Sequence, residues 1–172
     1  MSTPRLREMT EADITALITL GRRIWNLHYP GIITQQQIDH IVPIIYNTTR
    51  IRDELARGVR YLLAEIEKDI VGYIAWEAIA DTPSAYFIHK LYVDPTRHRM
   101  GIASSLLSAA LQRIPHATHV ELLTHRQNVK GLAFYEKQGF EIIAAPETPI
   151  GDYFFPDYRL RKMLHYGTRA AV

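Results

Sequence analysis

The sequence contains no cysteine, and several other classes of feature are missing with it. Without cysteine there is no disulfide framework, no thiolate metal ligand and no cysteine nucleophile, and a reducing cytoplasm is the expected compartment. No uncharged apolar run is long enough to cross a bilayer, so we expect no contact with a membrane. Charged residues near the N-terminus replace the apolar core that a signal peptide needs; they are Arg5, Arg7, Glu8 and Glu11.

Charge of one sign is also lacking, because the formal net charge is only +2. That balance by itself does not indicate a nucleic-acid-binding protein. Hydrophobic residues make up 47% of the chain and charged residues 22%, an ordinary globular composition that argues against disorder. At 172 residues we expect one domain over residues 1–172, with a frayed tail over residues 165–172.

Apolar residues at helical spacing predict three helices near the N-terminus. The first covers about residues 11–28 and ends in an aromatic segment before Pro30-Gly31. The second contains Pro43, where we expect a kink or a break because proline lacks an N–H group. The predicted caps are Thr10 with Asp13 for the first helix, Thr34 with Gln37 for the second, and Thr48 or Thr49 for a third helix that ends at Gly58.

β-Branched and aromatic runs predict about seven strands. They cover residues 5–9, 60–67, 70–80, 86–93, 119–124, 140–144 and 152–163. Lys68-Asp69 is a predicted tight turn and residues 145–151 a predicted loop. A helix over 103–114 and a helix that Asn128 caps separate the later strands. The order predicts an α/β (α+β) fold with helices on both faces of one mixed, mostly antiparallel sheet.

One stretch between a predicted strand and a predicted helix carries the clearest chemical signal. Leu91-Tyr92-Val93 ends the strand, a basic turn follows at residues 97–99, and Gly101 precedes the helix. A helix N-terminus has N–H groups without intrahelical partners, which suit a phosphate, and glycine lets the phosphate approach closely. The alternative is a capped helix beside a solvated basic turn. The glycine pattern fits neither a nucleotide-triphosphate P-loop nor a dinucleotide fingerprint.

These residues resemble the GNAT superfamily of acyl-CoA-dependent N-acetyltransferases. The motif is Leu91-Tyr92-Val93 with Pro95, followed by His98-Arg99-Met100-Gly101-Ile102-Ala103; His98 stands where the family usually has Gln or Arg. Asn128 and the segment 134–140 are similar to the family's second motif. The first helix end, residues 25–32, and the segment 151–158 resemble the diamine (spermidine/spermine-type) branch.

The resemblance implies a sheet splayed between its fourth and fifth strands, with acetyl-CoA as co-substrate in the cleft. The pyrophosphate would lie on residues 99–104 and the pantetheine arm along Leu91–Val93, where a backbone N–H polarises the thioester. The implied cofactor-binding residues are Leu91, Tyr92, Val93, His98, Arg99, Met100, Gly101, Ile102, Ala103, Ser104, Asn128 and Lys137. A homodimer joined through the last strands would also fit the resemblance.

Tyr135 matches the family tyrosine that protonates the departing sulfur, a role that suits a phenol with a pKa near ~10. The base is open between His28, His89, Glu77 and Glu121, and His89 is expected on the same strand face as Leu91. Each histidine could equally be a surface or core residue. Trp25, His28 and Tyr29 form an aromatic pocket suited to a cationic substrate.

Other readings of the histidines and the basic turn remain. His119, Glu121 and His125 share strand parity, but no ligand pair has a recognised metal spacing, so we expect no metal. The basic turn lacks interleaved aromatics for nucleic acid. The expected function is acetylation of a primary amine by direct attack, on a small polyamine-like or amino-sugar molecule. The alternatives are acetylation of a protein lysine or N-terminus, and a non-catalytic acyl-CoA-binding module.

Overall fold

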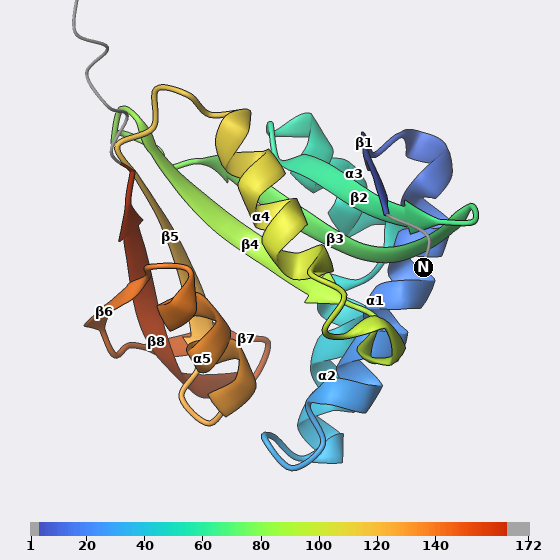
Figure 1. The fold of residues 1–172 in the computed structure, drawn as a ribbon. Coiled ribbons are helices and arrows are strands. Elements are labelled where there is room, and N and C mark those ends of the chain that lie inside the picture. Colours follow the sequence, from blue (N-terminus) through green and yellow to red (C-terminus); the bar gives the residue numbers. More distant parts are fainter. Residues whose placement is uncertain (1–3, 165–172) are drawn as a thin grey trace, which may run out of the picture.

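The computed structural model describes residues 4–164, which form one sheet with helices on both faces (Figure 1). The strands are β1 (Arg5–Glu8), β2 (Arg60–Ile66), β3 (Asp69–Ala78), β4 (Ala85–Val93), β5 (His119–His125), β6 (Glu141–Ala144), β7 (Glu147–Ile150) and β8 (Tyr153–Met163). The helices are α1 (Ile14–His28), α2 (Gln35–Ile45), α3 (Thr48–Ala56), α4 (Ile102–Gln112) and α5 (Val129–Lys137), with short 3-10 turns at Glu11–Asp13 and Pro95–Arg97. The predicted tail at 165–172 lies outside the described residues.

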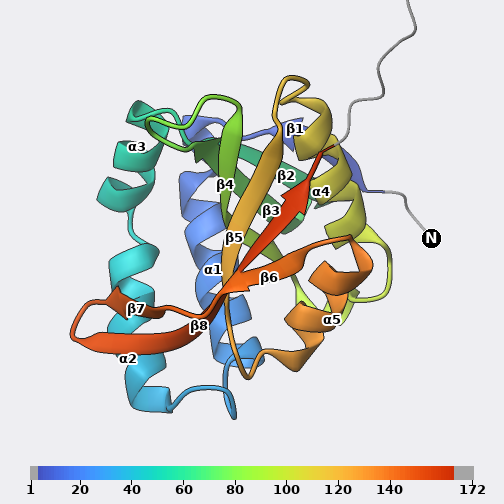
Figure 2. The same cartoon turned by 90° about the vertical axis from the view of Figure 1, so that its left-hand side faces the viewer.

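The sheet runs in the order β1-β2-β3-β4-β5-β8-β6, and β7 pairs with β8. All neighbouring strands are antiparallel except β4 and β5, which are parallel. Figure 2 looks along the layers and shows α1, α2 and α3 on one face, with α4 and α5 on the other. This arrangement confirms the predicted mixed, mostly antiparallel sheet with helices on both faces.

The sheet has eight strands, and the additional one lies in the predicted loop over residues 145–151. There β7 and β8 form a hairpin whose turn contains Gly151 at a φ of 56°. Pro149 suggested a loop, but β7 pairs only with β8, and proline is tolerated in such an edge strand. This hairpin, called the β7–β8 hairpin below, crosses in front of α2 in Figure 2.

Two of the three predicted caps of the N-terminal helices are confirmed. Capping boxes form at Thr10–Asp13 and at Thr34–Gln37, as predicted. The third helix is capped by Asn47, whose side chain accepts from the Arg50 N–H, so the expected Thr48 or Thr49 cap is wrong. Helix α2 continues through Pro43 to Ile45, so no break occurs there.

Two corrections concern neighbouring details. Pro43 lies in the last turn of α2, and the Asn47 amide donates to the carbonyls of Pro43 and Ile44, which supports the helix end that proline weakens. The turn between β2 and β3 is Glu67-Lys68, one residue earlier than expected, and both residues have positive φ. Both positions in a type I′ hairpin turn need this conformation.

A hydrophobic cluster covers each face of the sheet. One packs α4 and part of α5 against residues such as Trp76, Ile88 and Leu122. The other packs α1, α2 and α3 against Tyr61, Tyr73 and neighbours. Strands β2 and β3 contribute alternate side chains to both clusters, as the period of two requires. Within residues 4–164, no helix has the length and apolar character needed to span a bilayer.

A β-bulge in β4 changes which residues face which cluster. Ala75 pairs with Lys90 and Trp76 with Ile88, so His89 is the extra residue. Leu91 packs on the α4 side, whereas His89 contacts Glu77, which in turn pairs with Arg57 beside α3. The expectation that His89 shares a face with Leu91 is therefore wrong, because the bulge breaks the simple alternation.

Candidate active site

The site lies where the parallel ladder between β4 and β5 ends. Their register runs from Ala85–His119 to Ile88–Leu122, and beyond these pairs the strands separate. A cavity of about 380 Å³ opens on the α4 side, and a cavity of about 210 Å³ opens on the side of the β7–β8 hairpin. We call them the α4-side cavity and the hairpin-side cavity. Their shared wall consists of Tyr29, Ile88, His89, Lys90, Tyr92, Leu123 and Thr124.

The first turn of α4 borders the α4-side cavity with free backbone donors. Gly101 is the N-cap residue and has a φ of 72°, a conformation that glycine adopts without strain. The first helical hydrogen bond runs from Ser105 N to Gly101 O at 2.9 Å, so the N–H groups of Ile102, Ala103 and Ser104 precede the ladder. Such a terminus is a ready anion site.

The turn before α4 adds side chains to this part of the cavity wall. Arg99 and His98 line the α4-side cavity, and the His98 Nε2–H donates to the Val93 carbonyl at 3.2 Å. The Asp94 carboxylate, paired with Arg23 at 2.9 Å, also holds the turn. Burial acts to raise the pKa of Asp94, but the Thr96 hydrogen bonds and Arg23 outweigh it and the pKa is lowered.

Asn128 joins α5 to the cavity wall. Its Oδ1 accepts from Gly131 N at 3.2 Å and from His28 Nε2 at 3.1 Å, and its Nδ2 donates to Thr124 Oγ1. Because an amide oxygen only accepts, the His28 Nε2 carries a proton. Burial lowers the pKa of His28. His28 lines the α4-side cavity and not the hairpin-side cavity, so it does not share a pocket with Trp25 as expected.

Tyr135 faces the α4-side cavity from α5 and packs edge-on against Phe134 and Phe140, with ring centroids 5.3 and 5.5 Å away. Burial raises the pKa of its phenol, which therefore stays protonated at neutral pH. Of the predicted cofactor-binding residues in this turn, Met100, Gly101, Ile102 and Ser104 do not line the cavity with their side chains, and Ile102 is buried in the core. Lys137 is exposed at the end of α5 and lines neither cavity.

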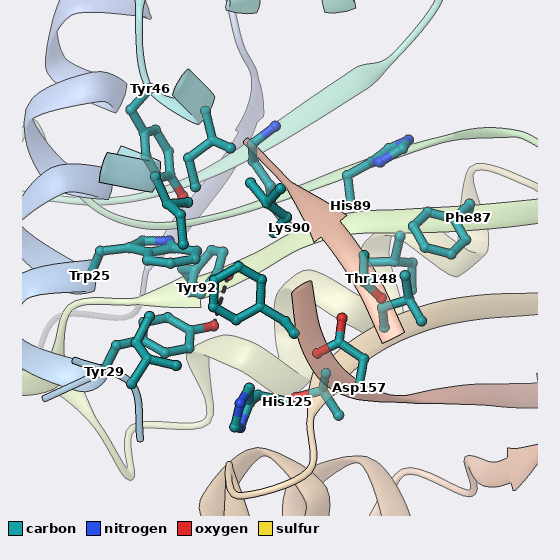
Figure 3. Close-up of a pocket in the computed structure, with 18 of the residues that line it drawn as sticks. Trp25, Tyr29, Tyr46, Phe87, His89, Lys90, Tyr92, His125, Thr148 and Asp157 are labelled. Atoms are coloured by element: carbon teal, nitrogen blue, oxygen red, sulfur yellow. Dashed lines mark hydrogen bonds between the residues drawn. The ribbon is translucent and has the colours of Figure 1, made fainter. Parts of the chain in front are cut away.

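The hairpin-side cavity has aromatic walls (Figure 3). Trp25 and Tyr29 stack with ring centroids 4.1 Å apart, and the hydroxyls of Tyr29 and Tyr92 are 3.1 Å apart. Burial raises the pKa of Tyr29, so these phenols are neutral. Such rings offer faces that attract cations.

His89 borders both cavities, and its Nε2 lies 2.6 Å from Glu77 Oε1. Burial lowers the pKa of His89 even though Glu77 acts to raise it. The carboxylate holds the proton on Nε2 and leaves Nδ1 as an acceptor. Glu121, in contrast, is bonded to Arg159 and Arg161 at 2.7 and 2.8 Å and lines neither cavity.

The sequence predicts no substrate-site role for four polar residues of the hairpin-side cavity, and it indicates His125 only for the metal alternative. They are Glu54, Lys90, His125 and Asp157, each at most 8% exposed. Lys90 Nζ lies 2.7 Å from Glu54 Oε2, and the Tyr61 hydroxyl donates to the same oxygen. A charged residue beside Ile51 on the apolar face of α3 was the available signal for Glu54. The sequence contains no comparable signal for Asp157, because this residue is buried only when the β7–β8 hairpin forms.

The proposed metal alternative on β5 does not assemble. Glu121 is occupied by two arginines, and His125 lies in the hairpin-side cavity. Residues 4–164 contain no cluster of three or more His, Asp or Glu side chains able to hold an ion.

A helix N-terminus suited to an anion therefore lies beside a splayed parallel strand pair, where two cavities share a wall. The chain belongs to the acetyltransferase (GNAT) family, whose model matches residues 24–140. It is accordingly an acetyl-CoA-dependent N-acetyltransferase.

Particular relatives support this assignment. A spermidine N(1)-acetyltransferase of Thermoplasma acidophilum is 26% identical over 144 residues, which cover 80% of this chain and 88% of that protein. The crystal structure of PaiA N-acetyltransferase from Thermoplasma acidophilum, in complex with coenzyme A, has a TM-score of 0.81 at 25% identity and covers 95% of this chain and 100% of that chain. A GCN5-related N-acetyltransferase from Rhodopseudomonas palustris shares the fold with a TM-score of 0.81 at 17% identity, covering 95% and 98% of the two chains.

Proposed function

We propose that the enzyme transfers the acetyl group of acetyl-CoA directly to a primary amine of a small, polyamine-like molecule. The observation that carries this proposal is the shared wall between the two cavities, where a thioester from the α4 side meets an amine from the hairpin side. A volume of about 210 Å³ lies below the roughly 300–1,000 Å³ of pockets for drug-sized ligands. A small acceptor fits such a space better than a folded protein substrate.

The α4-side cavity is the place for acetyl-CoA in this proposal. The N–H groups of Ile102–Ser104 and the Arg99 side chain bind the pyrophosphate. The edge of β4 at Leu91–Val93, which β5 leaves free, binds the pantetheine arm, and one of its N–H groups polarises the thioester carbonyl. The spermidine N(1)-acetyltransferase and the coenzyme A complex of PaiA both support this choice of substrates.

The transfer then needs one base and one acid. An alkyl ammonium has a pKa of about 10 and must lose a proton before it attacks. His89, oriented by Glu77, accepts that proton at Nδ1, and the amine nitrogen forms a bond to the carbonyl carbon. The carbon–sulfur bond breaks, and the Tyr135 hydroxyl gives its proton to the sulfur. The nitrogen releases its second proton to water, and water in turn reprotonates the Tyr135 phenolate. His28 holds Asn128 and thereby the start of α5.

CoA release against a panel of amines tests this function. The panel contains alkyl mono- and diamines, amino sugars and a lysine peptide, and we expect turnover with small alkyl amines. Tyr135→Phe should lower kcat by about 10²-fold or more, the range for general acid catalysis, with acetyl-CoA affinity unchanged. Tyr158→Phe, on β8 and outside both cavities, is the matched control. Binding of acetyl-CoA without turnover of any alkyl amine would contradict the proposed function.

A further inference from the structure

The hairpin-side cavity contains a buried carboxylate without a cationic partner. Asp157, on β8, is 7% exposed, and its carboxylate points into the cavity (Figure 3). Among the described residues, no lysine, arginine or histidine forms an ion pair with it. A buried charge is costly unless a partner compensates for it.

The two nearest basic residues are engaged elsewhere. The Arg126 guanidinium bonds the carbonyls of Ala145 and Pro146, the Glu147 carboxylate, and only the main-chain oxygen of Asp157. His125 Nδ1 accepts from the Gln127 N–H at 3.1 Å, which assigns the ring proton to Nε2 and keeps the ring neutral. Neither residue forms an ion pair with the Asp157 carboxylate, although the nearby charge of Arg126 acts to lower its pKa.

The carboxylate of Glu54, which also lines this cavity, does have cationic partners. Glu54 pairs with Lys90 at 2.7 Å and with Arg50 at 2.8 Å, so its charge is balanced within the protein. Asp157 is thus the carboxylate in the cavity wall that is left for a ligand cation.

Two further features surround Asp157. Thr148, on β7, has a buried hydroxyl that acts to lower the pKa of Asp157, and Figure 3 shows it on the same side of the cavity as that carboxylate. Tyr29 and Tyr92 present their rings to the same space. Burial raises the pKa of Asp157 and outweighs Thr148, His125 and Arg126, which act to lower it. A carboxylate, a hydroxyl and aromatic faces together suit an alkyl ammonium.

We propose that Asp157 binds the ammonium group of the acceptor that is not acetylated, and so selects diamines over monoamines. This inference rests on the proposed function and adds the residue that determines specificity. Asp157 lines only the hairpin-side cavity and is not part of the wall that both cavities share. The attacking amine must be neutral, whereas the second amine of a diamine keeps its charge at neutral pH and needs a buried counter-charge.

The test compares 1,4-diaminobutane with butylamine, which has the same carbon chain and one amine. Wild-type enzyme should show kcat/KM at least about thirtyfold higher for the diamine, equivalent to about 2 kcal/mol. Asp157→Asn should remove most of this preference through a higher KM for the diamine and change kcat/KM for butylamine less than about threefold. Asp152→Asn removes an exposed carboxylate at the turn of the same hairpin and should leave the preference intact.

Each other outcome overturns the inference. The inference is overturned if the wild-type enzyme has equal kcat/KM for the two amines. It is also overturned if Asp157→Asn, shown to be folded by its acetyl-CoA affinity, loses kcat/KM equally for both amines. The first result would leave amine acetylation in place, and the second would move Asp157 to the reacting amine. If the wild-type enzyme releases no CoA with any alkyl amine, the proposed function itself fails.

Discussion

Glu54 and Lys90 form a buried ion pair in which Glu54 has further partners and Lys90 has fewer. Glu54 is 2% exposed and also bonds Arg50 and Tyr61, whereas Lys90 is 8% exposed and, within residues 4–164, its only ion pair is with Glu54. We predict that Glu54→Leu destabilises the protein more than Lys90→Met does. The first change leaves a buried ammonium without a carboxylate, and the second leaves a carboxylate that still has two partners.

The magnitudes follow from burial. Breaking a buried pair on one side costs about 3–5 kcal/mol, which we assign to Glu54→Leu. At roughly 2–4 °C per kcal/mol for a protein of this size, Tm falls by about 6–20 °C. For Lys90→Met we expect about 1.5–3 kcal/mol, the cost of one lost hydrogen bond to a charged group. The double variant should recover much of the loss, because it leaves neither charge unpaired.

The same argument predicts how the stability of Glu54→Leu changes with pH. Burial lowers the pKa of Lys90, and Glu54 acts to raise it. Without Glu54 the folded protein binds this proton less well than the unfolded chain does. Stability of Glu54→Leu should therefore rise, relative to wild type, as the pH increases from the lowered pKa toward about 10.4, the ordinary lysine value.

Thermal unfolding followed by circular dichroism, without acetyl-CoA, measures these differences. Arg52→Met breaks an exposed pair with Glu11 at 2.6 Å and serves as the control, with an expected cost under about 1 kcal/mol. The reasoning is refuted if Lys90→Met is as destabilising as Glu54→Leu, or if Glu54→Leu matches the exposed control.

Three further predictions concern single residues. His89→Gln should lower kcat by about 10²-fold or more. Burial lowers the pKa of His89, so kcat of the wild-type enzyme should fall only below about pH 6.5. A fall that begins above this pH contradicts the role of His89 as the base. Gly101→Val should cost about 1–2 kcal/mol at a φ of 72° and weaken acetyl-CoA binding in calorimetry, whereas Gly31→Val, at a φ of 87°, should be strained without affecting that binding. Gly21→Ala should lower stability by about 1–3 kcal/mol, because its Cβ would lie 2.2 Å from the buried Tyr46 ring, and an unchanged Tm would show that the ring can move.

Local signals in the sequence predicted local structure. The capping boxes at Thr10–Asp13 and Thr34–Gln37, and the Asn128 cap, depend on residues three apart and were read correctly. The Gly101 turn and the amphipathic α4 behind it were found for the same reason. Such features require no knowledge of what packs against them.

Features that depend on long-range pairing were missed. The bulge at His89 arises from the register between β3 and β4, and no periodicity within β4 reveals it. The β7–β8 hairpin was read as a loop because Pro149 and Gly151 are turn residues. These two errors account for the face wrongly assigned to His89 and for the omission of Asp157 from the site.

The short ladder between β4 and β5 also has a mechanical consequence. Four register pairs join β5 to β4, and β8, β6 and β7 reach the rest of the sheet through β5. A co-substrate arm paired with the free edge of β4 would continue this ladder and tie the two parts together. Saturating co-substrate should thus slow amide hydrogen exchange in β5 and β8 more than in β2, which already has a strand on each side.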